Sequence, residues 1–265
     1  MTFENYNVEV RERVKCISAI DGVPISTQWE SQGYYYPTQI AQFGLSHYSK
    51  NLTEPESVKK IIEDAEKIRH DWMVPQGSVI SRVYDKRVNS YVMKYATQAK
   101  SVSGISTKLD LVLKLMLKVD VCMRDNGSIT VELQMRERKD IYYLHYVTNN
   151  HVLYTHNNHI YYGIGQVYNL WKRLTRDLMV DLQKGLAIVD KVKKKISRSK
   201  LKILRIILSG SGMIDNMTLS SSEHMEQFYD AARWFVANQN VTSGGWSNPV
   251  KRKVANGMTI LEPGW

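Results

Sequence analysis

The sequence predicts a mainly β protein with an antiparallel β-sandwich at its centre, and three observations support this class. Apolar residues recur at every second position from Leu109 to Val121 and from Ile129 to Met135. That spacing places one side chain in two on each face of a sheet. Short β-type segments continue from 142 to 164, separated by Asn149-Asn150 and Asn157-Asn158. Regular short strands with turn residues between them are typical of a sandwich.

The two alternating segments are predicted to pair as one long hairpin with a dry face, turned at Asp125-Asn126-Gly127. The next segment, Trp171 to Leu182, has helical spacing, but a sandwich favours extended chain, and we expect a strand. Met213 to Leu219 is predicted to be the closing strand.

Residues 1–56 are predicted to form an arm with its own β-hairpin. Asp21-Gly22 stands between the short apolar runs Val14–Ile20 and Val23–Ile25, which is a hairpin turn signal. A hairpin without a core must lean on a later domain or on a second subunit. Residues 57–70 carry apolar side chains at helical spacing and predict a short amphipathic helix.

The periodicity changes again at Ser220. Ser220 and Glu223 form a possible capping box, and apolar residues at helical spacing follow as far as Asn238. We therefore divide the chain into an arm at 1–56, a β-sandwich domain at 57–219 and the start of a helical domain at 220–265.

Composition sets limits on compartment and class. The chain has 265 residues, is 43% hydrophobic and 23% charged, and has neither a signal-peptide pattern nor a membrane-spanning run, so no membrane anchor is expected within it. Its two cysteines, Cys16 and Cys122, are predicted to be separate buried thiols, although one disulfide is arithmetically possible. Four Asn-x-Ser/Thr acceptors favour a lumenal glycoprotein: Asn51, Asn126, Asn216 and Asn240.

The net charge of +10 is concentrated in one place, because Lys191 to Arg205 holds eight basic residues and no acid. Such a patch suits a polyanionic partner. A solvated edge strand protected by lysines explains it equally well.

Several common chemistries have no support in the sequence. There is no Gly-rich loop after a strand, no Gly-x-Ser-x-Gly elbow, no His-Glu-x-x-His and no Cys-x-x-Cys. We therefore expect no nucleotide or redox cofactor and no zinc site.

The stretch from Gly33 to Lys50 is the strongest candidate for a binding surface. Three consecutive tyrosines precede Pro37, and amides, a phenol and an ammonium follow. This mixture suits a hydroxyl-rich, negatively charged ligand. The alternative is an aromatic cluster that only packs the arm.

The chain resembles the D-glucuronyl C5-epimerases of heparan sulfate and heparin synthesis over nearly its whole length. The resemblance rests on many segments in order, including Val14–Ser18, Gly22–Trp29, Tyr34–Leu52, Asp71–Pro75, Asn126–Ser128, His145–Val147, Ile160–Gly165, Thr175–Leu178, Ile214–Asn216, Asn238-Gln239, Gly244–Trp246 and Leu261–Trp265.

The resemblance implies an isomerase that converts D-glucuronate to L-iduronate within heparan sulfate or its N-sulfated heparosan precursor. A base would remove the C5 proton, an acid would return one on the opposite face, and a cation would neutralise the carboxylate. In the family the principal acid/base residues lie in a helical α/α-barrel domain, beyond Trp265 here. No residue of this chain is therefore assigned a catalytic role, and the chain alone is expected to be inactive. The family also implies a Golgi lumen location, a single-pass type II membrane anchor and a homodimer of the full-length protein.

The family's arm motif implies substrate contacts in this chain at Tyr34, Tyr36, Gln39, Gln42, Tyr48 and Lys50. Tyr35 stands where the family has Phe, so we expect it to face away or to pack.

The family's sandwich is associated with Ca²⁺, which prefers oxygen ligands. Candidates are Asp125, Asn126 and Asp215, which could converge when the strands pair. Ser101 and Ser103 stand where the family has a Thr-x-Glu pair, so a carboxylate is missing. The alternative is that all of these are turn and cap residues.

Two other functions remain open. The chain could be a non-catalytic carbohydrate-binding β-sandwich for sulfated glycosaminoglycan. A nucleic-acid binder is weaker, because the tyrosine and glutamine arm has no role there, and we expect no nucleic-acid partner.

Overall fold

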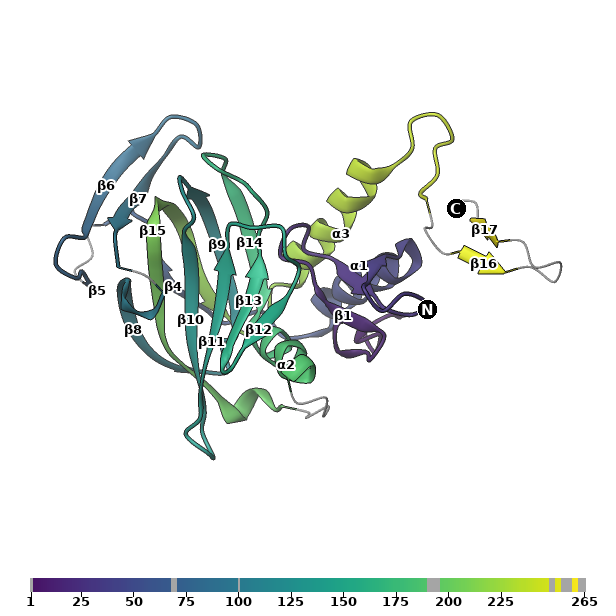
Figure 1. The fold of residues 1–265 in the computed structure, drawn as a ribbon, viewed down its shortest axis with the longest axis horizontal. Helices are drawn as coiled ribbons and strands as arrows, with labels where there is room; N and C mark the ends of the chain where they lie inside the picture. Colours follow the sequence, from purple (N-terminus) through teal and green to yellow (C-terminus); the bar gives the residue numbers. More distant parts are fainter. Residues whose placement is uncertain are drawn as a thin grey trace. The chain divides into compact units, whose positions relative to one another are not determined.

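The computed structural model describes residues 2–67, 71–99, 101–189 and 196–247, and the short strands at 251–253 and 259–261 (Figure 1). The chain divides into two compact units. The first unit comprises Met1–Glu56 and His224–Trp265, and the second comprises Ser57–Glu223. Within the part of the chain that is described, no helix is long and apolar enough to cross a membrane.

The second unit is a β-sandwich, which confirms the predicted mainly β class. One layer follows the order β12 (Tyr154–His156), β13 (His159–Gly163), β11 (Ile141–Val147), β10 (Ser128–Met135), β15 (Leu201–Ser220), β8 (Ile105–Val112) and β5 (Trp72–Met73). The other layer contains β14 (Lys172–Asp177), β9 (Met116–Met123), β15 again, β4 (Lys59–Glu63), β7 (Ser90–Thr97) and β6 (Val79–Asp85). These pairs are antiparallel except β11–β13, which is parallel.

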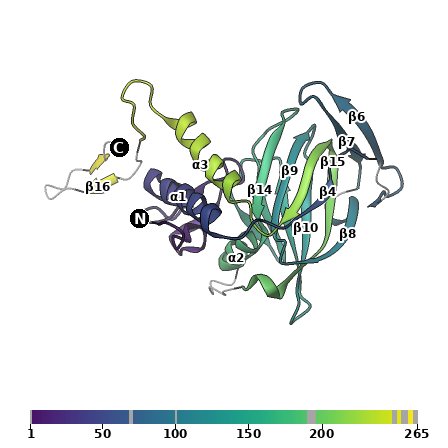
Figure 2. The same ribbon diagram turned by 180° about the vertical axis from the view of Figure 1, so that it is seen from behind.

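The long strand β15 serves both layers (Figure 2). Its first part, to Ser209, lies between β10 and β8, and its later part pairs with β7, β9 and β4. Gly210 marks the change, with a φ of +79°. A Cβ there would lie 2.5 Å from Asp125 Oδ1 and 2.7 Å from Gly127 Cα, so only glycine fits.

The predicted long hairpin is wrong. The alternating segment breaks into β8 and β9, with positive φ at Asp110 and Leu113, and β9 pairs with β14 and β15 while β10 pairs with β11 and β15. Asp125 to Gly127 therefore carries the chain from one layer to the other. Period-two spacing marks a strand face but does not tell which strand lies beside it.

Two other segments differ from prediction. The helix expected at 57–70 is wrong, because Lys59–Glu63 is strand β4, paired with β15, and residues 68–70 lie outside the described residues. Pairing with an existing sheet outweighs a short helical pattern. The expected strand at Trp171–Leu182 is half right. Strand β14 ends at Asp177, whose Oδ1 accepts N–H bonds from Met179 and Val180 and so begins helix α2 (Leu178–Val189).

The predicted closing strand, Met213–Leu219, is confirmed as part of β15. Short 3₁₀ turns occur at η2 (Ser101–Ser103) and η3 (Arg198–Lys200), and β16 (Lys251–Lys253) pairs with β17 (Thr259–Leu261).

The first unit confirms the arm hairpin. Strands β1 (Val14–Ile17), β2 (Pro24–Ser26) and β3 (Tyr34–Tyr35) form one small antiparallel sheet, and Gly22 turns with a φ of +73°. The short turn η1 (Val8–Val10) precedes them, and helix α1 (Pro37–Thr53) follows. The tyrosine stretch therefore leads directly into a helix, with Pro37 at its first turn.

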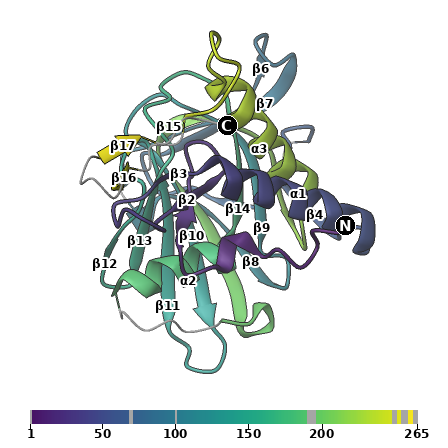
Figure 3. The ribbon, with the colours of Figure 1, turned by 90° about the vertical axis from the view of Figure 1, so that its right-hand side faces the viewer.

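Helix α3 (His224–Asn238) lies beside α1 within this unit (Figure 3). The expected capping box does not form, because α3 begins at His224 and Ser220 Oγ instead donates to the side chain of Glu223, at 2.9 Å. The helix packs within its own unit. It shares one buried core with the arm, made by Val8, Val14, Ile17, Val23, Ile40, Phe43, Ala231 and Trp234.

The predicted separate thiols are confirmed, because Cys16 and Cys122 are both free and buried. In the basic run, residues 191–195 lie outside the described residues. The remaining basic residues form ion pairs: Arg198 with Asp177, Lys200 with Glu137, Lys202 with Asp110 and Arg205 with Glu132. The edge-strand interpretation is wrong for Leu201–Ser209, which lies between β10 and β8.

Candidate functional site

The tyrosine stretch places its rings on two sides of β3. Neighbouring side chains of a strand point to opposite faces, so Tyr34 and Tyr36 share one side and Tyr35 takes the other. Trp29 joins the first side, with ring centroids 5.2 Å from Tyr36 and 6.3 Å from Tyr34. Tyr34 and Tyr36 lie 6.1 Å apart. Trp29 is 48% exposed, so this aromatic cluster reaches the surface.

Tyr35 packs, as expected. Its ring lies 5.8 Å from Trp234, and its hydroxyl donates to Asp21 and, at 3.2 Å, to Ser18. Burial raises the pKa of Tyr35, and the Asp21 carboxylate adds to that effect. Tyr35 therefore joins the hairpin turn to α3 and is a structural residue.

Helix α1 places three of the other predicted contacts on one side, given about 100° of rotation per residue. Gln39 is buried, Gln42 Oε1 accepts from Arg11 Nη1 at 2.9 Å, and Lys50 Nζ lies 3.4 Å from Glu9 Oε1. The sequence analysis missed the partner residues Glu9 and Arg11. In the sequence, Glu9 and Arg11 alternate with Val8 and Val10, and this alternation could have indicated that the two charged side chains share one side of the segment.

Tyr48 is placed elsewhere. It lies roughly half a turn around α1 from Gln39, is 43% exposed, and packs on Phe228 with ring centroids 5.3 Å apart. The structure therefore brings Tyr34 together with Tyr36, and places Gln39 and Gln42 on one side of α1 with Lys50 about 16 Å from Gln39 along the same side. It leaves Tyr48 apart.

The arm contains buried polar atoms that lack a hydrogen-bond partner: Glu9 Oε2, Tyr34 Oη, Gln39 Oε1 and His47 Nε2. Buried polar atoms in folded proteins are nearly always paired, so such atoms call for a ligand or an ordered water. Burial raises the pKa of Tyr34. The nearby Ser26 hydroxyl lowers the pKa of Tyr34 by a smaller amount, but it does not form a hydrogen bond of normal geometry with Tyr34 Oη. The Tyr34 phenol therefore stays protonated at neutral pH and can donate a hydrogen bond.

His47 is a structural residue in this unit. Its Nδ1 lies 2.9 Å from His224 Nδ1, and His224 Nε2 lies 3.0 Å from Glu54 Oε2. Burial lowers the pKa of His47, and the nearby Lys50 and His224 add to the effect. The imidazole is therefore neutral, which suits a hydrogen-bonded position in the core of this unit.

The predicted calcium ligands do not converge. Asp125 accepts from the backbone N–H of Ser211 at 2.9 Å and from its hydroxyl at 2.7 Å, and Asn126 Oδ1 accepts from Tyr168 at 2.6 Å. Asp215 lies opposite Asp120, four residues along β15 from Ser211, which corresponds to about 13 Å.

The remaining candidates do not complete a calcium site. Ser101 and Ser103 lie in η2, and Ser103 is exposed. Across the described ranges, no group of three or more His, Cys, Asp or Glu side chains is placed to hold a metal ion. These residues fit the turn and cap interpretation better than a calcium site.

Comparison with known proteins identifies the sandwich. Residues 89–211 match the family model described as the D-glucuronyl C5-epimerase beta-sandwich domain. The sandwich is that of the D-glucuronyl C5-epimerase family. A D-glucuronyl C5-epimerase from Caenorhabditis elegans is 29% identical over 301 residues, which cover 99% of this chain and 49% of that protein. The chain thus spans about half the length of this epimerase relative.

Two solved structures match this chain weakly. A xylan-binding domain from CBM 22 is 9% identical with a TM-score of 0.36, covering 61% of this chain and 94% of that one. A family 11 carbohydrate-binding module from Clostridium thermocellum is 14% identical with a TM-score of 0.36, covering 62% and 95%. Likeness at this level carries no argument about ligands.

Proposed function

We propose that this chain supplies the arm and β-sandwich of an enzyme that epimerises D-glucuronate to L-iduronate at C5 within heparan-type polysaccharide. The match of the sandwich to the epimerase family supports the reaction class. The substrate would be N-sulfated heparosan or heparan sulfate. Because the chain spans about half of its epimerase relative, the activity of the whole protein is part of this proposal.

The observation that carries the proposal is the polar face of the arm. Two partnerless buried atoms, Tyr34 Oη and Gln39 Oε1, belong to residues of the motif that the family resemblance singles out. A phenol O–H and an amide oxygen suit the hydroxyl groups of a sugar. Lys50 adds a positive charge for a uronate carboxylate, in competition with Glu9 at 3.4 Å.

We propose that these residues hold the sugar and that the C5 proton is moved by other groups. A general base works best with a pKa near the working pH. Burial moves the pKa of Tyr34 in the opposite direction, so Tyr34 is a poor base. By itself this chain should therefore bind the polysaccharide without exchanging the C5 proton.

The cellular setting follows from the family proposal. The whole protein would act in the Golgi lumen, held by a type II membrane anchor, and would be a homodimer. A structural Ca²⁺ stays a prediction, and the described residues give it little support.

Binding of an N-sulfated heparosan octasaccharide, measured by isothermal titration calorimetry, tests the arm. The double variant Tyr34→Phe/Gln39→Leu should bind about thirtyfold more weakly, since two hydrogen bonds of about 1 kcal/mol each are removed. Tyr229→Phe is the matched control, because Tyr229 lies on α3 of the same unit and is 48% exposed. Unchanged affinity in the double variant would reject the arm as the contact surface.

Incubation of the chain with N-sulfated heparosan in D₂O tests whether the chain binds the polysaccharide without exchanging its C5 proton. Binding without deuterium at C5 is the expected result, and deuterium incorporation would show that the chain contains an acid and a base. The alternative function, a glycan-binding sandwich without chemistry, predicts that variants of the second unit alone alter affinity.

A further inference from the structure

A hollow of about 510 Å³ lies on the sandwich, over β6, β7, β9 and β15. Cross-strand pairing explains its position. Met213 on β15 pairs with Lys94 on β7 and with Cys122 on β9, so these three side chains share one face. The neighbouring residues along the strands, including Met93, Tyr95 and Ile214, are buried on the opposite, core-facing side.

A small apolar cluster adjoins the hollow and contributes Val83 and Met213 to its lining. Val92, Cys122 and Met213 are buried, and Val83 and Trp171 pack against them. The cluster gives a ligand a dry surface of aliphatic carbon and sulfur.

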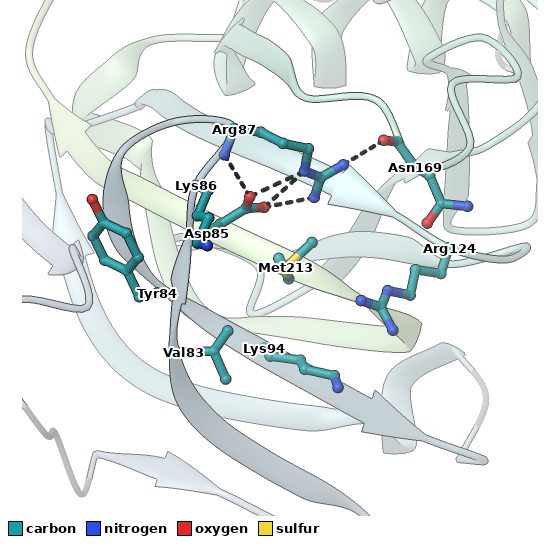
Figure 4. A pocket seen from close by; sticks show the side chains of 9 residues that line it. All are labelled: Val83, Tyr84, Asp85, Lys86, Arg87, Lys94, Arg124, Asn169 and Met213. Carbon is teal, nitrogen blue, oxygen red and sulfur yellow. Dashed lines mark hydrogen bonds and ion pairs between the residues drawn. The ribbon is translucent and has the colours of Figure 1, made fainter.

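One wall is a fixed arginine. Arg87 Nε lies 3.1 Å from each oxygen of Asp85, its Nη2 lies 2.6 Å from Asp85 Oδ2, and its Nη1 donates to the Asn169 carbonyl at 2.7 Å (Figure 4). Trp171 Nε1 also donates to Asp85 Oδ2, at 3.0 Å. Hydrogen bonds from Arg87 hold the pKa of Asp85 well below its usual range, so the carboxylate is negatively charged. This negative charge neutralises the positive charge of Arg87.

Three further cations line the hollow without such compensation. Lys86, Lys94 and Arg124 have no ion pair or side-chain hydrogen bond among the described residues, and Asp85 is the only acid in the lining. Four positive charges against one negative charge leave a surplus of three. In Figure 4 the side chains of Lys94 and Arg124 extend into the same region beside Met213.

We propose that this hollow binds an acidic saccharide, with Lys94 and Arg124 holding a sulfate or carboxylate group. Arginine offers paired N–H donors to such groups, and lysine adds a mobile positive charge. The apolar face of the sugar ring would lie on Val83 and Met213. The surplus positive charge and the hollow are observed on the sandwich and do not depend on any role of the arm. Only the choice of a saccharide as the ligand rests on the proposed function.

The lining disfavours single-stranded nucleic acid. Binding of bases needs exposed aromatic faces on which they stack. Tyr84, the one aromatic residue of the lining, is 49% exposed and packs edge-on against Tyr91 at 5.4 Å, so the lining offers a single ring and no row of rings for successive bases. Trp171 packs on the apolar cluster and bonds to Asp85.

Titration of the full chain with an N-sulfated heparosan hexasaccharide at two salt concentrations tests the proposal. The variant Lys94→Gln/Arg124→Gln should bind about tenfold more weakly and show a smaller salt dependence, since two charge contacts are lost. Lys60→Gln/Lys114→Gln is the matched control, since it removes the same charge from other parts of the unit, and its affinity should change less than about twofold. Unchanged melting temperatures would show that both variants are folded.

Four outcomes would overturn the proposal. They are wild-type affinity in Lys94→Gln/Arg124→Gln, an equal loss in the control variant, equal binding of single-stranded RNA at the same salt, and full competition by inorganic sulfate at the hexasaccharide concentration. Non-sulfated heparosan distinguishes the anion, because it retains only carboxylates.

The arm variant Tyr34→Phe/Gln39→Leu separates this inference from the proposed function. If only the arm variant weakens binding, the hollow is rejected and the arm stands. If only the hollow variant does so, the reverse holds.

Discussion

Buried polar groups are treated differently in the Arg176 network of the sandwich and in the arm, although Tyr95 Oη, Arg198 Nη1 and Thr218 Oγ1 of the sandwich also lack partners. In the sandwich, Arg176 is fully buried, and its Nη2 and Nε lie 2.6 and 2.9 Å from the two oxygens of Asp181. Tyr146 donates to the same carboxylate at 2.7 Å, and Tyr162 donates to the Asp181 carbonyl at 2.8 Å. In the arm, by contrast, Gln39 and Tyr34 keep atoms without partners.

We interpret this difference as one between structural residues and the proposed binding residues. The Arg176 network joins β14 and α2 to the tyrosines of β11 and β13, and a network whose members satisfy one another rigidifies a core. The Arg176 network and the arm both lie within segments of the family resemblance, so resemblance alone does not tell the two roles apart. We distinguish them by whether their buried polar atoms have hydrogen-bond partners.

Arg176→Leu is expected to give the largest effect. It leaves the Asp181 carboxylate buried without its cation, and loss of one partner of a buried pair costs about 3–5 kcal/mol of unfolding free energy. Urea denaturation followed by tryptophan fluorescence would measure this loss. Arg173→Leu is the control, because Arg173 is 45% exposed in its pair with Asp120, and about 1 kcal/mol or less should be lost. The double variant Arg176→Leu/Asp181→Leu should recover part of the stability, and no recovery would contradict the ion-pair explanation.

Substitution of His145 should give the next largest effect on the free energy of unfolding, and this effect should depend on pH. Its Nδ1 lies 2.8 Å from Thr130 Oγ1 and its Nε2 lies 2.8 Å from His159 Nδ1. Burial, with a smaller contribution from His159, lowers the pKa of His145 to about 4. The folded state therefore resists protonation that the unfolded chain accepts near pH 6.5.

The sign follows from proton linkage. Between pH 6.5 and 4 the unfolded chain binds more protons at this position, so stability is present above pH 6.5 and falls as the pH drops, by up to about 3 kcal/mol. His145→Gln should flatten this slope in urea denaturation at a series of pH values. The lowered pKa of His47 has the same sign in the other unit. An unchanged slope in His145→Gln would assign the acid sensitivity elsewhere.

Gln39→Leu should give the smallest effect on stability. It removes a buried amide oxygen that has no partner, so the unfolding free energy should change by less than about 1 kcal/mol, or rise. Gln42→Leu is the comparison, because it breaks the 2.9 Å bond from Arg11 and should cost about 1 kcal/mol. A large loss in Gln39→Leu would place Gln39 among the structural residues, with Arg176.

The sequence predicted the positions of strands and helices better than it predicted which strands pair with one another. The hairpin at Gly22 depends on local turn chemistry and helix α3 on apolar residues at helical spacing, which a short stretch determines. The predicted pairing of Leu109–Val121 with Ile129–Met135 was wrong, because apolar alternation is the same whichever strand lies beside it. The hollow was not predicted, since Arg87, Lys94 and Arg124 come from three separate segments.

The sequence by itself determined the mainly β class, the hairpin turn and the motif that indicates the epimerase family, because each depends on residues close together in the chain. Tertiary structure decided that β15 serves both layers and that α1 and α3 share a core. It also decided which polar atoms find partners. A buried polar atom finds a hydrogen-bond partner only when a segment far away in the sequence lies within bonding distance, and a local sequence pattern does not determine that distance.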